Sequence, residues 1–352
     1  MGCHDELSWT WPPDLKEADG QMPEHTRRLG KSGIEVSALG LGCWPIGGPW
    51  TLDGRPVGRG VVDEAEAIHA IHSALDLGIR FFDTAATYGA GRSERILGGA
   101  LAGRRAEVVI ATKFGVRVDE ENRTAGRDSK AVLGNVRQDC EDSLRRLGTD
   151  WIDLFQLHLG DYPIEKAAAL RPALEDLVAE GKIRAYGWST DEVDRPRVLA
   201  EGEHCAAVQH ELNLLTDAPV MLALCDDCDL ASINKYPLLM GILAGRFGVE
   251  ATFPADDIRQ RAIPLDSEKR TRWFAQLNAV REVLTQDGRT LAQAALGWIW
   301  ARSDRTIPIP GFRTSSQVEE NGRAMDFGPL EDAQMRQIEE ILERQPSDRE
   351  GT

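Results

Sequence analysis

Short apolar segments alternate with longer amphipathic segments along most of the chain, beginning near residue 26. Each apolar segment has the length and composition of a buried strand and is bounded by glycine or polar residues. The sequence therefore predicts eight strands, over residues 38–43, 80–84, 108–113, 152–158, 183–189, 206–212, 231–236 and 306–310. A short hairpin that turns at residues 31–33 is predicted to precede them.

The segments between the strands carry apolar residues at helical spacing. In residues 129–147, Val136, Cys140 and Leu144 recur at every fourth position and form one stripe. Gly148 follows this helix, at a position where a left-handed conformation favours glycine. The expected helices cover residues 62–78, 129–147, 166–180, 192–202, 217–229, 270–285, 290–302, 315–325 and 330–344.

This alternation predicts an α/β fold, a (β/α)8 TIM barrel with an N-terminal β-hairpin and extra C-terminal helices. The alternative is a doubly wound open sheet. A dinucleotide-binding sheet of that kind would carry G-x-G-x-x-G and a helix directly after its first strand. Here the first strand ends in LGLGCWPIGG, and no helix is predicted to follow directly, so we favour the barrel.

One domain is expected over residues 26–345, with a tail over residues 346–352. Residues 1–25 are interpreted as an N-terminal extension that is poorly ordered, because they show no helix or strand periodicity. Trp9 and Trp11 offer the alternative that this extension is pinned to the surface of the barrel.

The composition narrows the class of protein. Hydrophobic residues make up 42% of the chain, which is ordinary for a globular protein, and the formal net charge is −16. An acidic surface repels phosphate backbones and anionic lipids, so neither nucleic acid nor membrane is an expected partner. No apolar run approaches the roughly 20 residues of a spanning helix, and the first residues do not resemble a secretory signal. Six cysteines without regular spacing favour a cytoplasmic location.

Polar residues of four different types follow three successive predicted strands. Asp83 ends the second strand with Tyr88 in the loop after it, Lys113 ends the third, and His158 ends the fourth. In a barrel these strand ends converge on one rim, where active sites lie. A nearby ammonium lowers the pKa of a tyrosine from about 10. The set therefore predicts a general acid, Tyr88, with Lys113 lowering its pKa, Asp83 holding the lysine, and a neutral His158 orienting a carbonyl group.

Each of these residues also has an ordinary structural interpretation. Lys113 could be a solvated strand end, Asp83 the cap of a turn, and His158 a rim histidine with satisfied hydrogen bonds. Taken together at consecutive strand ends, the four residues favour a catalytic site.

Several segments resemble the aldo-keto reductase family. They include FFDTAATYGAGRSERILGGAL (81–101), VVIATKFG (108–115) and LRRLGTDWIDLFQLH (144–158). The opening RRLGKSGIEVSALGLGCWPIGG (27–48) and later segments GWST (187–190), VQHELN (208–213) and PGFRTSSQVEEN (310–321) also match in order. The resemblance covers about residues 26–345.

The resemblance implies a (β/α)8 barrel that reduces an aldehyde or ketone to an alcohol with NADP(H), by hydride transfer from the nicotinamide. By position, Asp83, Tyr88, Lys113 and His158 match the catalytic tetrad of the family. It also implies a set of cofactor-binding residues: Gly42, Cys43, Trp44, Ser189, Thr190, Gln209, Lys235, Tyr236, Pro237, Leu238, Gly241, Arg246, Gly311, Arg313, Gln317, Glu320 and Asn321.

Within this set the resemblance implies separate roles. Ser189 and Gln209 match positions that bind the nicotinamide carboxamide, and Arg246 is in the segment along the pyrophosphate. Arg313 and Gln317 match positions that hold the adenosine 2′-phosphate, where a guanidinium can bind phosphate through two hydrogen bonds. Their helix, 315–325, offers its N-terminus to the same phosphate, although a capped surface helix would use the same residues.

Two positions depart from the family pattern. Thr190 stands where the family usually has Asn, which puts the second carboxamide contact in question. Lys235 stands where an aromatic residue usually stacks on the nicotinamide, with Tyr236 next to it. Either Tyr236 takes the stacking role through a shift of register, or Lys235 places a charge beside the ring or on the pyrophosphate.

The leading hypothesis is thus an NADP-dependent oxidoreductase acting on a small carbonyl substrate. The alternatives are a cofactor-binding regulatory subunit with slow turnover and a dehydrogenase that works in the oxidative direction on a sugar or polyol. No metal site is expected, because Cys225 and Cys228 have no second pair at suitable spacing. The sequence does not indicate the physiological substrate, the preferred direction or the oligomeric state.

Overall fold

The computed structural model describes residues 25–343, in which eight parallel strands form one sheet in the order β14-β13-β12-β11-β10-β7-β6-β3. Its two edge strands meet where Gly42 N–H donates to Pro310 O (3.1 Å) and Gly42 forms a bridge with Gly311. The sheet therefore closes into the expected barrel. The strands are β3 (Gly40–Gly42), β6 (Phe81–Asp83), β7 (Val109–Phe114), β10 (Ile152–Leu157), β11 (Ile183–Ser189), β12 (Cys205–Glu211), β13 (Ala231–Lys235) and β14 (Thr306–Pro308).

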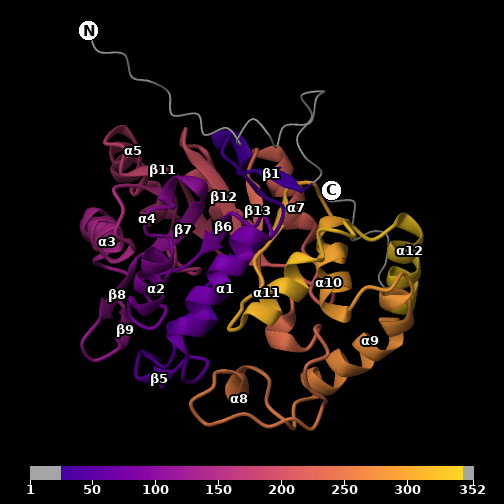
Figure 1. The fold of residues 1–352 in the computed structure, drawn as a ribbon. Helices are drawn as coiled ribbons and strands as arrows, with labels where there is room; N and C mark the ends of the chain where they lie inside the picture. The colour runs from indigo at the N-terminus through magenta and orange to yellow at the C-terminus, as the bar shows by residue number, and fades with distance from the viewer. Residues whose placement is uncertain (1–24, 344–352) are drawn as a thin grey trace.

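Helices surround the barrel (Figure 1). They are α1 (Glu64–Asp76), α2 (Arg92–Ala100), α3 (Val132–Leu147), α4 (Ile164–Ala168), α5 (Arg171–Ala179), α6 (Asp194–Ala200), α7 (Pro219–Asp227), α8 (Arg259–Ala262), α9 (Glu268–Thr285), α10 (Leu291–Trp300), α11 (Ser315–Gly322) and α12 (Asp332–Ile341). All nine predicted helical segments contain helix, although the segment 166–180 divides into α4 and α5. The prediction omitted α2, in which Gly98 and Gly99 interrupt the helical signal, and the one-turn helix α8 within the connection 246–269.

The N-terminal hairpin closes one end of the barrel. Its strands β1 (Thr26–Arg28) and β2 (Glu35–Ser37) pair antiparallel, and apolar side chains of the hairpin, including Leu29, join the cluster inside the barrel. The Lys31 N–H donates to Asp229 O (2.9 Å), just before β13. Because the strands begin at this end, solvent reaches the barrel interior from the opposite end, where the strands finish.

Two loops at that opposite end form a second sheet, which was not predicted. The loop after β3 contains β4 (Thr51–Leu52) and β5 (Arg55–Pro56), and the loop after β7 contains β8 (Val116–Asp119) and β9 (Thr124–Arg127). Strands β4 and β9 pair in parallel, which gives the order β5-β4-β9-β8. We call this four-stranded sheet the rim sheet; β5, β8 and β9 lie at the end of the molecule far from β1 (Figure 1).

The long connection 246–269 also reaches this end of the barrel. Ile258 N–H donates to Gly58 O (3.0 Å), and Arg59 forms a bridge with Asp257. On the other side, the Arg313 guanidinium donates to Arg59 O (2.9 Å) and to Val61 O. We call residues 58–61 the strap, because they connect the two segments across the rim.

Two further results concern the limits of the chain and of the helices. The predicted N-terminal extension and C-terminal tail lie, apart from residue 25, outside the described residues. Among residues 25–343, no helix has both the length and the apolar character that crossing a membrane requires.

Candidate active site

A buried ion pair lies at the finishing end of neighbouring strands β6 and β7. The Lys113 ammonium donates to both Asp83 carboxylate oxygens (2.8 and 2.7 Å) and to Thr84 O (2.8 Å). The two side chains are 0% and 2% exposed. Burial lowers the pKa of Lys113, and the Asp83 carboxylate opposes that shift. Removal of one partner would leave an uncompensated charge inside the protein.

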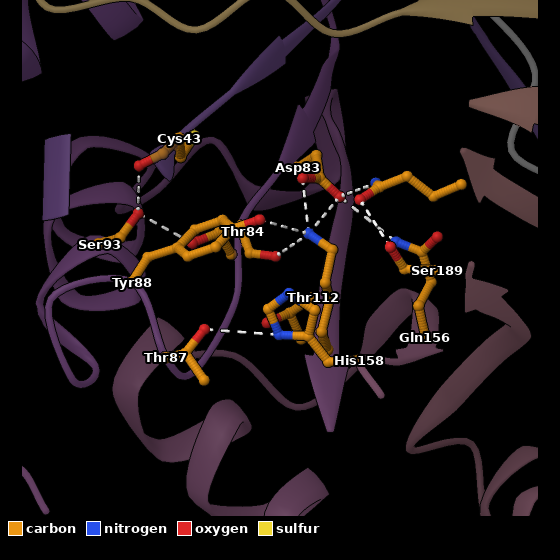
Figure 2. A network of polar contacts seen from close by, with 12 residues as sticks. Cys43, Asp83, Thr84, Thr87, Tyr88, Ser93, Thr112, Gln156, His158 and Ser189 are labelled. Carbon is orange, nitrogen blue, oxygen red and sulfur yellow. Dashed lines mark hydrogen bonds and ion pairs between the residues drawn. The ribbon is translucent and has the colours of Figure 1, made fainter. Parts of the chain in front are cut away.

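The turn after β6 carries Tyr88 back over this ion pair. Gly89 in that turn has φ +65°, and a Cβ atom there would lie 2.0 Å from Gly47 O. Glycine is therefore required at position 89. The Ser93 hydroxyl, from α2, donates to Cys43 O (2.8 Å) and accepts from the Thr84 hydroxyl (2.9 Å), which ties the turn to the ends of β3 and β6 (Figure 2).

The Lys113 ammonium also donates to the Tyr88 hydroxyl oxygen, at 3.1 Å. Its three protons are thus shared among four acceptors, because the two Asp83 oxygens lie at similar distances. Since that oxygen accepts from the lysine, the hydroxyl proton is free to point into the cavity. The predicted lowering of the Tyr88 pKa is wrong: burial raises it well above 10, and Asp83 and Cys43 add to the increase. The physical reason is that Tyr88 is desolvated and that the Lys113 charge is balanced by Asp83. Tyr88 thus holds its proton at neutral pH.

His158 follows β10 and faces the Tyr88 ring edge to face, with ring centroids 5.8 Å apart. Its Nδ1 lies 3.4 Å from Thr87 Oγ1. Burial lowers the His158 pKa well below 6.5, and the positive charges of Lys113, Lys235 and Arg127 lower it further. The imidazole is therefore neutral, as the sequence predicts.

Glutamine side chains fix Asp83 from the other side. Gln209 Nε2, on β12, donates to Asp83 Oδ1 at 2.7 Å, and Gln156 Nε2, on β10, donates to the same oxygen at 3.3 Å. Ser189 Oγ donates to Gln209 Oε1 at 3.4 Å. Figure 2 shows Ser189 and Gln156 on the side of Asp83 away from Tyr88. The sequence analysis missed Gln156, whose signal was only a polar residue inside an apolar strand.

A cavity of about 550 Å³ opens above these residues, within the range of small-molecule sites. Tyr88, His158 and Asp83 line it. Most of the predicted cofactor-binding residues line it as well: Gly42, Trp44, Ser189, Gln209, Lys235, Tyr236, Pro237, Leu238, Gly241, Arg246, Gly311, Arg313, Gln317 and Asn321.

Three predicted cofactor residues are placed elsewhere. Cys43 is fully buried beneath the cavity. The Thr190 hydroxyl donates to Gly160 O (2.8 Å), and Thr190 is not among the residues that line the cavity. Glu320 is held by Arg246 at 2.7 Å and does not line the cavity.

Both members of the unusual Lys235-Tyr236 pair line the cavity. Strand β13 ends at Lys235, and Tyr236 takes a left-handed conformation (φ 55°), so the strand alternation of side chains stops there. Lys235 forms an ion pair with Asp191 (2.8 Å). The Tyr236 ring packs edge to face against Trp44, with centroids 6.3 Å apart.

The N-terminus of α11 is partly occupied by protein groups. Thr314 Oγ1 accepts from Gln317 N–H (3.4 Å), and Glu66 accepts from Ser315 N–H (2.8 Å). The sequence analysis assigned the N-terminus of this helix to phosphate, but one of its N–H donors, that of Ser315, is satisfied by a carboxylate. Three arginine side chains at this end of the cavity can bind an anion: Arg313, and Arg59 and Arg259, which the sequence analysis missed.

The chemistry of this end fits a phosphorylated dinucleotide. Burial, together with the neighbouring positive charges of Arg259 and Arg313, lowers the Arg59 pKa to about 10, while the Asp257 carboxylate opposes that shift. The buried Arg59 Nε has no hydrogen-bond partner among the described residues. The same holds for the Oδ1 atom of Asn321, an acceptor of the kind that an adenine amino group requires.

The family model described as the Aldo/keto reductase family matches residues 38–343. The chain belongs to the aldo/keto reductase family. It is thus an oxidoreductase of a family that acts on small carbonyl compounds, as the sequence predicts.

Relatives with known names cover nearly the whole chain. It is 30% identical to the aldo-keto reductase YhdN of Bacillus subtilis, over 92% of this chain and 95% of that protein. It is also 30% identical to an aldo-keto reductase of Schizosaccharomyces pombe named with NADP(+), over 90% and 91% of the two chains. The NADH-specific methylglyoxal reductase of Escherichia coli is 30% identical, over 90% and 98%. The relatives therefore include both cofactor types.

The fold is similar to that of solved aldo-keto reductases. The glycerol dehydrogenase of Gluconobacter oxydans superposes with a TM-score of 0.78, at 29% identity, over 94% of this chain and 98% of that one.

Proposed function

We propose that this protein reduces an aldehyde or ketone to an alcohol with NADPH, and that Tyr88 is the general acid. The observation that carries the proposal is the direction of the Lys113–Tyr88 hydrogen bond, in which the tyrosine oxygen accepts. The Tyr88 proton then remains available for a carbonyl oxygen in the cavity.

In the proposed reaction, a bound reduced nicotinamide would supply the hydride that the carbonyl carbon accepts. Tyr88 donates its proton to the carbonyl oxygen, where negative charge develops in the transition state. The positive charge of Lys113 then lies 3.1 Å from the tyrosine oxygen and stabilises the phenolate. Neutral His158 orients the carbonyl by donating a hydrogen bond, and Asp83 holds Lys113 in position.

The proposed cofactor is NADP(H), with the 2′-phosphate beside Arg313, Arg59 and Arg259. Guanidinium groups bind phosphate well because their planar donors match its oxygens. Ser189, Gln209 and the Lys235-Tyr236 pair would surround the nicotinamide, and Arg246 the pyrophosphate. Arg246 would then exchange Glu320 for phosphate.

The test is the steady-state consumption of NADPH with a panel of aldehydes, for the wild type, Tyr88→Phe and Tyr162→Phe. Tyr162 is a buried tyrosine that does not line the cavity, so its variant is the matched control. We expect turnover to fall about a hundredfold or more in Tyr88→Phe, with NADPH affinity unchanged. Near-normal turnover in Tyr88→Phe would exclude this tyrosine as the acid. Very slow turnover of the wild type would favour a regulatory subunit.

A further inference from the structure

One cationic side chain on the cavity wall has no partner among residues 25–343. Six cationic side chains line the cavity, namely Arg59, Arg127, Lys235, Arg246, Arg259 and Arg313. Carboxylates hold four of them, and Arg313 donates to backbone carbonyls of the strap. The Arg127 guanidinium has neither an ion pair nor a hydrogen bond within residues 25–343, although its backbone N–H donates to Asp53.

Arg127 stands on the catalytic side of the cavity. It ends β9 and lies opposite Val116, which follows β7, the strand that carries Lys113. Its charge reaches His158, where it is one of the positive charges that lower the imidazole pKa. In the barrel, β6 and β3 separate β7 from β14, the strand before Arg313. Arg127 is therefore apart from the arginines that would hold the cofactor phosphate.

The wall beside Arg127 is apolar. The rim sheet and its flanking loop contribute Trp50, Leu52, Val57 and Val116 to the same cavity. A ligand here would place apolar groups against this wall and one negative charge at its edge. A single guanidinium suits a carboxylate, which it binds through two hydrogen bonds, whereas a phosphate dianion would call for several cations.

We propose that Arg127 determines substrate specificity by binding a carboxylate, so that the substrates are oxo acids with an apolar spacer between the carbonyl and the carboxylate. The inference rests on the proposed reduction at Tyr88. A locally positive cavity also draws an anion toward the site against the net charge of −16.

The test compares 4-carboxybenzaldehyde with its uncharged methyl ester, as substrates of the wild type, Arg127→Gln and Arg123→Gln. Arg123 is exposed on the same hairpin and does not line the cavity, so its variant removes the same charge elsewhere. We expect the wild type to prefer the acid by about tenfold or more in kcat/KM. Arg127→Gln should lower kcat/KM for the acid by about 10- to 100-fold. Its kcat/KM for the ester, and the kcat/KM of Arg123→Gln for both substrates, should stay within about twofold of the wild-type values.

Three outcomes would overturn the proposal: equal kcat/KM of the wild type for acid and ester, equal losses for both in Arg127→Gln, or the same loss in Arg123→Gln. A second pair of substrates, glyceraldehyde 3-phosphate and glyceraldehyde, tests whether Arg127 binds a phosphate instead of a carboxylate. If Arg127→Gln lowers only the phosphorylated substrate, the ligand is a phosphate and the carboxylate assignment is wrong.

A binding experiment separates this proposal from the proposed function. The alcohols 4-(hydroxymethyl)benzoate and its methyl ester are titrated against tryptophan fluorescence, since Trp44 and Trp50 line the cavity. Selective weakening of the benzoate in Arg127→Gln supports the carboxylate site even if no aldehyde is reduced, in which case the proposed function alone fails. Equal affinity of the wild type for both alcohols overturns the Arg127 proposal.

Discussion

The Lys113 ammonium lies 3.1 Å from the Tyr88 hydroxyl and donates to its oxygen, while the same ammonium holds Asp83 at 2.7 and 2.8 Å. One buried lysine therefore has two functions. It keeps the Asp83 charge compensated, and it fixes the direction of the tyrosine proton. Substitution of Lys113 should affect both stability and activity.

Lys113→Met should abolish most activity and lower the free energy of unfolding by about 3–5 kcal/mol, because it leaves the Asp83 charge buried without a counter-ion. Chemical denaturation and NADPH consumption measure the two effects. The double variant with Asp83→Asn should recover much of the stability and none of the activity. Full activity of the double variant would show that Lys113 serves the fold alone.

The two titratable groups proposed to contact the carbonyl, Tyr88 and His158, predict that activity does not change with pH near neutrality. The His158 pKa is well below 6.5 and the Tyr88 pKa well above 10. Between pH 6.5 and pH 10, His158 stays neutral and Tyr88 stays protonated, so kcat/KM for reduction should be constant in this range. It should fall at higher pH, where Tyr88 loses its proton. The measurement is kcat/KM against pH. A step near neutrality that His158→Gln removes would contradict the neutral imidazole.

Glu66 should weaken the preference for the phosphorylated cofactor. Its carboxylate accepts from Ser315 N–H at the start of α11, close to Arg313 in sequence, and it would repel a 2′-phosphate at that end. Glu66→Gln should therefore lower the Kd of NADP(H) several-fold and leave that of NAD(H) nearly unchanged. Glu64→Gln, on the exposed side of the same helix turn, is the matched control. An equal change for both cofactors would place the phosphate away from Glu66.

Asp139 on α3 should make stability depend on pH. Burial raises the Asp139 pKa from 3.8 to about 6, although Gly115 N–H donates to it. The folded protein thus binds the proton more tightly than the unfolded chain, so this group's contribution to stability is lost as pH rises from about 4 to about 6. Asp139→Asn should remove this loss and stabilise the protein above pH 6 by up to about 3 kcal/mol.

Denaturation of wild type and Asp139→Asn from about pH 3 to about pH 7 checks the sign. The difference between them should vanish at about pH 3 and below, where wild-type Asp139 is protonated in both the folded and the unfolded state. Asp142→Asn, a half-exposed residue of the same helix, should give no such difference. A difference that does not change with pH would mean that the carboxylate is charged throughout.

The barrel, and the grouping of Asp83, Tyr88, Lys113 and His158 at one rim, could be predicted because their signals are local. Each strand is a short apolar run, and Asp83, Lys113 and His158 stand at the ends of such runs. The rim sheet could not be predicted, since β4 has two residues and pairs with a strand far along the chain. The shift of the Tyr88 pKa was predicted in the wrong direction, because the sequence does not show that Tyr88 is buried and that Asp83 balances the charge of Lys113.

Other contacts at the site could not be predicted either, because they also join residues that are far apart along the chain. Arg59 forms a β-bridge with Asp257, although almost two hundred residues separate them in the sequence. Glu66 of α1 accepts a hydrogen bond from Ser315 of α11. Polar residues in loops give no signal of their partners. The pairing is decided by the barrel, which brings loops from different strands to one rim.

The parallel pairing of β4 with β9 has a consequence for how this enzyme can change. Trp50, Leu52 and Val57 come from the loop after one barrel strand, and Val116 and Arg127 from the loop after another, yet backbone hydrogen bonds join the two loops into one wall. A substitution that moves one loop also moves the other, so combined substitutions across them will not add. We therefore expect the substrate range to change more readily when both loops are exchanged together, with the rim sheet kept whole, than when either loop is exchanged alone.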